Sequence, residues 1–448
     1  MTTRAALLAV GALASSAAAS PIAQVFTAYG ADPTTSLTLS WATSSACTPA
    51  AEAGPSATAL TPVPAASLTA DPRYDFNNAG GLPFYMRARL TGLPAGARVF
   101  YRVGCAGASP AWSPVASART PPARDSASPQ PTILLWGDMG RDGGEQVLPA
   151  LEVEAAAADS GAPGSATFAI IAGDYGYDLH DEAGARGARF MDRLSNISRS
   201  LPTMTTIGNH EQATGNATAY TNILGKAMPG PALGHWYSFD AGLIHFVMLS
   251  SEVYHMDPFT LDGGSLTISA PAQKAWLEAD LAAVDRAVTP WLVAVFHRPF
   301  YCSNADRDEC ANIPLLWPTN PLRVDLEPLF MTAGVDLCVE AHEHSVEVVY
   351  PINNGTVAQR DFVAPRAPIH FITGAAGCNE DSGLCWNPIA LDSPFTYKAL
   401  WGPEQYSYSR LRAVNASVLH IEQVKVIPDT SVWLALDIVQ PSHGPFPQ

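Results

Sequence analysis

Residues 167–177 read TFAIIAGDYGY, and this stretch decides the fold class. A short apolar run bounded by glycine is typical of a strand buried inside a sheet. The run ends directly in Asp174, and Tyr177 follows three positions later. Polar groups therefore stand where a buried strand ends, which is where functional sites gather in α/β domains.

Similar apolar runs recur along the chain, and helical segments separate some of them. The runs are TILLWG (132–137), PTMTTIG (202–208), LIHFVMLS (243–250), WLVAVF (291–296), VDLCVEA (335–341) and IHFITG (369–374). The helical candidates include 144–159, 183–198 and 271–286. This alternation predicts a layered α/β domain over residues 132–440.

The N-terminal part has a different pattern. Residues 20–122 contain alternating strand segments such as SLTLSWAT (36–43) and ARVFYRVG (97–104), and no helical period stands out. They predict a small all-β sandwich. Residues 123–131 are rich in Pro, Ser and small residues, which is typical of a linker between domains.

Composition sets limits on the class of protein. The 448 residues allow two or three domains, and 47% hydrophobic residues exclude a wholly disordered chain. The 25 basic and 41 acidic residues give a net charge of −16. We therefore expect no nucleic-acid partner, because phosphate backbones need a basic surface.

The chain begins with features of a secretory signal peptide over residues 1–19. Arg4 precedes the apolar run AALLAVGALA (5–14), and small residues follow it. A membrane anchor is the alternative, but the run is shorter than the ~20 residues that span a bilayer. We expect entry into the secretory pathway, with a final location outside the cell, in a lysosome or in a vacuole, and no membrane association after signal removal.

Seven cysteines and four glycosylation sequons fit that route. Spacing suggests pairs Cys47–Cys105, Cys302–Cys310 and Cys378–Cys385, with Cys338 left over, although sequence alone does not fix the connectivity. The sequons begin at Asn196, Asn216, Asn354 and Asn415.

Five of the apolar runs lead into residue types that bind metals. The candidates, in chain order, are Asp138, Asp174 with Tyr177, Asn209 with His210, His297, and His342 with His344. Each alone is more often a turn residue or a structural histidine than a ligand. Together they predict one crevice at the strand ends, in which one carboxylate bridges two ions ~3.5–4 Å apart, an arrangement suited to displacement at phosphorus.

The ordered motifs GDMG (137–140), GDYGY (173–177), GNHE (208–211), VFHRP (295–299) and AHEH (341–344) resemble those of the purple acid phosphatases, in the metallophosphoesterase superfamily. The tyrosine after the second aspartate distinguishes that branch. WSPVASARTPP (112–122) and YSYSRLRAVNASVLHI (406–421) extend the likeness to the long animal-type members, which carry a fibronectin type III-like domain before the catalytic domain.

The resemblance implies a fold and a site. The fold would be two packed mixed β-sheets flanked by helices, preceded by the sandwich. Asp138, Tyr177 and His344 would bind Fe(III), and Asp174 would bridge to a divalent Zn, Fe or Mn ion. Asn209, His297 and His342 would bind that second ion. His210 would contact the phosphate and assist proton transfer while a metal-bound hydroxide attacks phosphorus.

Charge supports this division of the donors. A phenolate at neutral or acid pH needs a highly charged ion, because tyrosine has an ordinary pKa of about 10. Two imidazoles and a neutral amide suit a divalent ion. The expected activity is hydrolysis of phosphate monoesters at acid pH, with a phosphorylated small molecule or protein as the substrate.

Two other functions stay open at this point. The same metal pair could cleave phosphodiesters or nucleotide pyrophosphates, or the chain could be a secreted binding glycoprotein without catalysis. The chain also departs from the family pattern. Asp306 and Arg307 stand where plant members carry histidines, and Val346, Glu347 and Val348 replace a Tyr-Glu-Arg segment. Arg298 is either a phosphate clamp or part of a surface ion pair.

Overall fold

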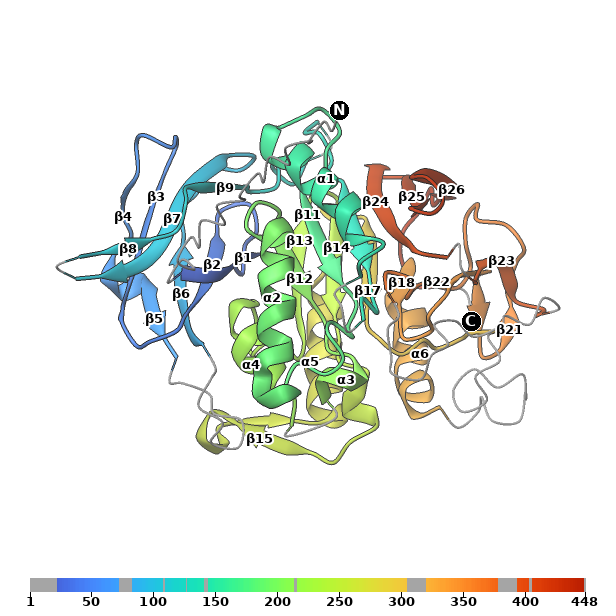
Figure 1. Ribbon diagram of the computed structural model, residues 1–448. Helices are drawn as coiled ribbons and strands as arrows, with labels where there is room; N and C mark the ends of the chain where they lie inside the picture. Colours follow the sequence, from blue (N-terminus) through green and yellow to red (C-terminus); the bar gives the residue numbers. More distant parts are fainter. Residues whose placement is uncertain are drawn as a thin grey trace, which may run out of the picture.

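The computed structural model describes residues 22–71, 83–107, 109–125, 127–140, 144–212, 216–303, 320–377, 393–402 and 405–446 (Figure 1). The predicted signal peptide and the predicted Cys378–Cys385 pair lie outside these residues, as do Asp306 and Arg307. Within them, no helix is long and apolar enough to cross a membrane.

The N-terminal region is all-β and consists of two sheets. The first has the order β1 (Ile22–Tyr29), β2 (Leu37–Thr43), β6 (Phe84–Leu90), β5 (Leu68–Ala70). The second has the order β4 (Thr61–Pro62), β3 (Thr48–Gly54), β7 (Arg98–Ala106), β8 (Ala111–Trp112), and β9 (Ala116–Arg119) also pairs with β7. A disulfide joins Cys47 to Cys105, as predicted, and so ties the start of β3 to β7.

Two mixed sheets follow. One has the order β12 (Thr203–Thr205), β11 (Phe168–Ile171), β10 (Ile133–Trp136), β24 (Ser407–Asn415), β25 (Val418–Lys425), β26 (Ser431–Val439). The other has the order β13 (Tyr237–Ala241), β14 (Ile244–Met248), β17 (Trp291–Val295), β18 (Leu337–Glu340), β22 (Ile369–Thr373), β19 (Val346–Val349), β23 (Thr396–Leu400). Each apolar run picked out between residues 132 and 374 contains a strand here.

The helices flank these sheets (Figure 1). They are α1 (Leu148–Ser160), α2 (Ala185–Ser198), α3 (Asn209–Gln212), α4 (Thr218–Ile223), α5 (Ala270–Ala283) and α6 (Pro321–Ala333). Single 3-10 turns lie at Ala65–Ser67, Glu182–Gly184, Gly225–Ala227, Glu252–Tyr254 and Asp262–Gly264. Two small hairpins pair β15 (Phe259–Leu261) with β16 (Leu266–Ile268) and β20 (Ile352–Asn353) with β21 (Thr356–Val357). The three predicted helices are confirmed as α1, α2 and α5.

One hydrophobic core joins the all-β region to the α/β layers. The ring of Tyr29 on β1 lies 5.3 Å from that of Phe168 on β11, and Phe168 lies 5.9 Å from Phe246 on β14. Because these rings come from three different sheets, the two regions share apolar packing. Beside them, Thr27 Oγ1 donates to the Ser198 carbonyl oxygen at 2.6 Å, so β1 also contacts the end of α2 (Figure 1).

Candidate metal centre

The predicted donors follow the strands closely, and parallel pairing brings the strand ends together. β10, β11 and β12 run parallel in one sheet, and β17 and β18 run parallel in the other. Several donors take left-handed backbone conformations that turn the chain back over the sheet edge. The φ angles are +57° at Asp138, +51° at Asp174, +31° at Tyr177 and +69° at His342. Such angles cost roughly 1–3 kcal/mol each and persist where the surroundings fix them, which is common at functional sites.

Asp138, Tyr177 and His344 form the first cluster of donors. The Tyr177 hydroxyl lies 3.1 Å from Asp138 Oδ1 and 2.9 Å from His344 Nε2. His344 Nε2 lies 3.5 Å from the same aspartate oxygen. The structure therefore brings a carboxylate, a phenol and an imidazole from three distant segments to one point.

Asp174, Asn209, His297 and His342 form the second cluster. His297 Nε2 lies 3.2 Å from Asp174 Oδ2, 3.0 Å from Asn209 Oδ1 and 3.2 Å from His342 Nδ1. The Asp174, His297 and His342 donor atoms lie close enough together to hold one metal ion. The His342 backbone N–H donates to Asp138 Oδ2 at 2.9 Å, which links the two clusters.

His297 is oriented from behind by the main chain. Its Nδ1 lies 2.8 Å from the Ala172 carbonyl oxygen, which can only accept, so Nδ1 carries the proton. The other ring nitrogen, Nε2, then faces the remaining side chains of the second cluster. Burial opposes the charge on Asp174, but the imidazole of His297, with those of His210 and His342, holds the pKa of Asp174 well below its usual range. The carboxylate is therefore charged and ready to bind cations even at acid pH.

Glu211 holds two of the donor loops together and was not predicted as a site residue. Its carboxylate accepts from the backbone N–H groups of Asp174 at 2.8 Å, Tyr175 at 3.0 Å and Gly208 at 3.0 Å. Burial, and after it the neighbouring Asp174 carboxylate, raises the pKa of Glu211 to about 8. The only sequence signal for this role was its place in the GNHE motif.

His210 lies beside the second cluster with its ring half-buried. Its backbone N–H donates to Asp174 Oδ1 at 3.1 Å, and its ring centroid lies 4.1 Å from that of Tyr177. Its Nδ1 lies 2.8 Å from Asp178 Oδ1. Asp178 is a second residue that the sequence did not single out, and it fixes which way the imidazole faces.

Arg298 forms an ion pair, but not at the open surface. Its Nε lies 2.9 and 3.1 Å from the two carboxylate oxygens of Glu252, whose side chain is only 2% exposed. Arg298 Nη1 also lies 3.3 Å from His342 Nε2. A buried carboxylate thus holds the guanidinium beside the second cluster, where it can meet an anionic substrate.

The side chains present fit a pair of metal ions. Asp138, Asp174 and His297 are at most 1% exposed, and buried carboxylates need cations or hydrogen-bond donors beside them. Every donor predicted from the sequence lies in one of the two clusters, and the backbone bond from His342 to Asp138 joins them. Carboxylate and imidazole groups are established ligands of iron and zinc, and the tyrosine oxygen is an established ligand of iron.

Comparison with known proteins identifies the family. Residues 22–120 match the purple acid phosphatase N-terminal domain, residues 131–346 the calcineurin-like phosphoesterases, and residues 367–432 the iron/zinc purple acid phosphatase-like protein C domain. Acid phosphatase type 7 of Mus musculus is 34% identical over 371 residues, covering 80% of this chain and 77% of that protein. The Homo sapiens protein of the same name is 34% identical over 367 residues, with the same coverage.

The chain belongs to the purple acid phosphatases.

A solved structure supports the fold assignment. The purple acid phosphatase PPD1 from Lupinus luteus seeds superimposes with a TM-score of 0.75 over 94% of this chain and 75% of that one, at 19% identity. With its family established, the chain is an acid phosphatase that hydrolyses phosphoesters at a dimetal centre. Its substrates are therefore phosphorylated compounds.

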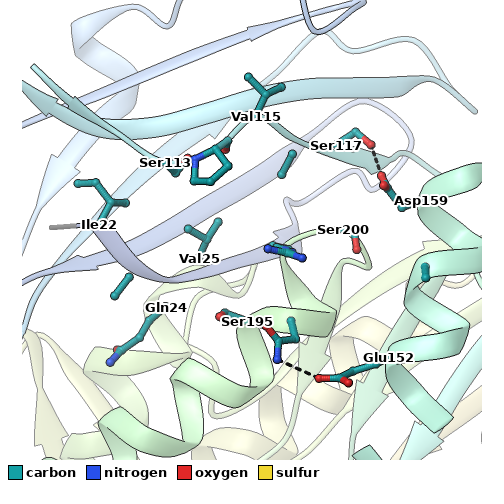
Figure 2. Close-up of a pocket in the computed structure, with 16 residues that line it drawn as sticks. Ile22, Gln24, Val25, Ser113, Val115, Ser117, Glu152, Asp159, Ser195 and Ser200 are labelled. Atoms are coloured by element: carbon teal, nitrogen blue, oxygen red, sulfur yellow. Dashed lines mark hydrogen bonds between the residues drawn. The ribbon is translucent and has the colours of Figure 1, made fainter. Parts of the chain in front are cut away.

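This purple acid phosphatase also has a cavity of about 730 Å³ between the all-β region and the catalytic layers. Its wall includes Val25 of β1, Glu152 and Asp159 of α1, and Ser195 of α2 (Figure 2). It shares no lining residue with the two donor clusters, so we assign it no part in the reaction.

Proposed function

We propose that the protein is a secreted acid phosphatase that hydrolyses phosphate monoesters with Fe(III) and a divalent Zn, Fe or Mn ion. The observation that carries the proposal is the placement of the Tyr177 hydroxyl between Asp138 and His344, at 3.1 and 2.9 Å. A tyrosine oxygen in a buried cluster with a carboxylate suits a trivalent ion, because only a strongly charged ion holds phenolate at acid pH.

The two clusters divide the proposed ligands. Asp138, Tyr177 and His344 would hold the iron, Asn209, His297 and His342 would hold the divalent ion, and Asp174 would bridge them. When bound, the two ions activate water as the nucleophile and offset the charge of the phosphoryl oxygens.

The protein groups around the ions supply orientation and proton transfer. His210 is held by Asp178 at Nδ1, so its Nε2 is the atom we assign to contact the phosphate and to carry a proton. Arg298, fixed by Glu252, adds positive charge beside His342. Both groups are placed before substrate arrives, which lowers the cost of organising the site during the reaction.

Secretion and glycosylation are part of the proposal. The asparagines of all four sequons, Asn196, Asn216, Asn354 and Asn415, are exposed. The Cys47–Cys105 disulfide fits an oxidising compartment, and Cys302 is also disulfide-bonded, although its predicted partner Cys310 lies outside the described residues. Protein from a secretory host should lose mass on enzymatic deglycosylation, and an unchanged mass would contradict this part.

The test of the metal assignment compares colour and activity in matched tyrosine variants. Purified protein should contain iron, show a visible phenolate-to-iron absorption band and hydrolyse an aryl phosphate. Tyr177→Phe should lose the band. Tyr175→Phe should keep it, because the Tyr175 hydroxyl donates to the Thr206 carbonyl oxygen instead. Active wild-type protein without iron or colour would refute the assignment, and faster turnover of the matching diester would refute the monoester specificity.

A further inference from the structure

A group of metal-binding side chains lies outside the dimetal centre, on β18 and β22. Cys338 and Glu340 are two positions apart on β18, so their side chains leave the same face of the sheet. Cys338 pairs in register with His370 on the parallel strand β22, which places His370 on that face as well. The exposed fractions are 0% for Cys338 and Glu340 and 1% for His370.

α6 and an aromatic cluster cover this face. Cys338 packs in the same apolar cluster as Phe300 and the α6 residue Phe330. The His370 ring lies 5.5 Å from that of Phe300 and 5.1 Å from that of Tyr301. Polar groups are uncommon at this depth, because burying them without satisfying all of their hydrogen bonds costs free energy.

The three side chains have the spacing of an ion site. The Cys338 sulfur, one carboxylate oxygen of Glu340 and one ring nitrogen of His370 lie within 4.8 Å of one another. Ligands of tetrahedral zinc lie roughly 3.3–3.8 Å apart, given bond lengths of about 2.0–2.3 Å. Movements of about 1 Å or less in the side chains would close the group around an ion.

Hydrogen bonding in the described residues satisfies only part of the group. Glu340 Oε1 lies 2.8 Å from His370 Nδ1 and accepts from the Phe300 backbone N–H at 3.1 Å. Glu340 Oε2 and His370 Nε2 have no hydrogen-bond partner among the described residues. Each such buried atom costs roughly 1–3 kcal/mol, so one carboxylate oxygen and one imidazole nitrogen remain for a further ligand.

We propose that Cys338, Glu340 and His370 form a third metal site, separate from the dimetal centre, that binds zinc. A thiolate, a carboxylate and a divalent cation sum to zero charge, which removes the penalty of burying each charge alone. Sulfur and imidazole ligands select zinc over magnesium or calcium, which prefer oxygen. The ion would tie β18 to β22 beneath α6, and β18 is the strand that leads to His342.

Metal counting tests the proposal with a matched control. Wild-type protein purified from zinc-supplemented cells should hold three metal ions per chain by elemental mass spectrometry. Cys338→Ala should hold one fewer, with the visible colour of the iron centre unchanged. Val339→Ala is the control, because it also shortens a fully buried side chain of β18 but removes no donor atom. Equal metal content in wild type and Cys338→Ala would overturn the site.

The count also separates this proposal from that of the iron centre. If the dimetal assignment fails, all three proteins lose the same ions, yet the difference of one between wild type and Cys338→Ala remains. If Cys338→Ala does not fold, wild-type protein refolded with Co²⁺ decides. It should show a thiolate-to-cobalt absorption band in the near ultraviolet, since none of the dimetal donors is a cysteine. Its absence would overturn the third site.

Discussion

At the residue scale, the proton-carrying group of the proposed mechanism depends on one unpredicted contact. Asp178 Oδ1 lies 2.8 Å from His210 Nδ1, while the His210 backbone is fixed separately by Asp174. The aspartate therefore sets the direction and the protonated nitrogen of the ring, and among the described residues its carboxylate bonds to His210 and to no proposed metal donor. At metal sites, loss of a partner that orients a ligating histidine typically costs 10–100-fold in metal affinity or activity, and we expect the lower end of that range for the non-ligating His210.

We predict that Asp178→Asn lowers kcat about ten-fold and leaves the metal content and the visible band unchanged. A purely structural role would instead lower the melting temperature together with the iron content, so both are measured. Asp181→Asn is the matched control, since Asp181 is a carboxylate of the same loop that pairs with Arg186 at 2.7 Å. Equal kcat values in the two variants would contradict the assigned role.

Sequence reasoning located the donors but not the residues that support them. Asp138 and Asp174 directly follow apolar runs, so a local pattern was enough to place them at strand ends. Glu211 accepts from the backbone N–H of Asp174, which is 37 positions away in the sequence. Glu252 accepts from the side chain of Arg298, which is 46 positions away. A polar residue carries no local signal of a contact that far along the chain, so only the folded arrangement shows it.

At the scale of elements, the loops after β11 and β12 approach so closely that one glycine is required. A Cβ added at Gly208 would lie 2.1 Å from Asp174 Oδ1 and 2.6 Å from the Asp174 backbone nitrogen. We predict that Gly208→Ala separates the two loops and lowers activity about 100-fold, the effect expected of a displacement near 1 Å, with metal lost as well.

Gly92→Ala controls for the substitution itself. Gly92 has φ +70°, but a Cβ there meets no atom within 4 Å. Its cost should be only the backbone strain, about 1 kcal/mol, with normal metal content and kcat. Normal activity in Gly208→Ala, measured in parallel, would show that the loops can move apart without harm.

The buried His245 connects β14 to β13 and α5, and it makes the stability of the protein depend on pH. His245 on β14 contacts Asp240 of β13 at 2.6 Å and Asp280 of α5 at 3.1 Å. Burial opposes its charge, but the two carboxylates outweigh burial and raise the pKa of His245 to about 9. Since the folded pKa exceeds the ordinary 6.5, the stabilisation is complete below pH 6.5 and is lost as the pH rises through about 9.

We therefore predict that His245→Gln lowers the free energy of unfolding by about 2 kcal/mol at pH 6 and by much less near pH 10. Denaturant titrations of both proteins at the two pH values measure the difference. If the loss of unfolding free energy in the variant is the same at both pH values or larger at high pH, His245 is not held as a cation.

Helix α6 was not among the helices predicted from the sequence. α6 contains Pro328, which removes a helical hydrogen bond and argues against a helix in a sequence pattern. Asn320 caps its first turn by accepting from the Arg323 N–H, and Leu326 and Phe330 are buried. Packing against the sheet that contains β17 and β18 outweighs the cost of the proline, and that packing is not visible in the local sequence.

At the scale of the whole molecule, the all-β region and the catalytic layers share one hydrophobic core. Sequence patterning separates residues 20–122 from 132–440, but it does not show that Tyr29 packs on Phe168 or that the Tyr29 hydroxyl donates to the Thr167 carbonyl oxygen at 3.3 Å. Arg87 also reaches from β6 to the Asn222 carbonyl oxygen of α4 at 2.5 Å. A shared core of this kind favours joint unfolding over separate unfolding of two domains.

We predict a single calorimetric transition for the metal-loaded protein, because the two parts share one hydrophobic core. Tyr29→Ala should lower the free energy of unfolding of the whole molecule by about 4 kcal/mol, the usual cost of removing a buried aromatic ring. The temperature at which activity is lost should fall by the same number of degrees as the calorimetric midpoint. Tyr29→Phe keeps the ring and should cost about 1 kcal/mol, the value of its hydroxyl bonds. If Tyr29→Ala instead splits the transition, with activity surviving the first step, the all-β region is dispensable for the catalytic fold.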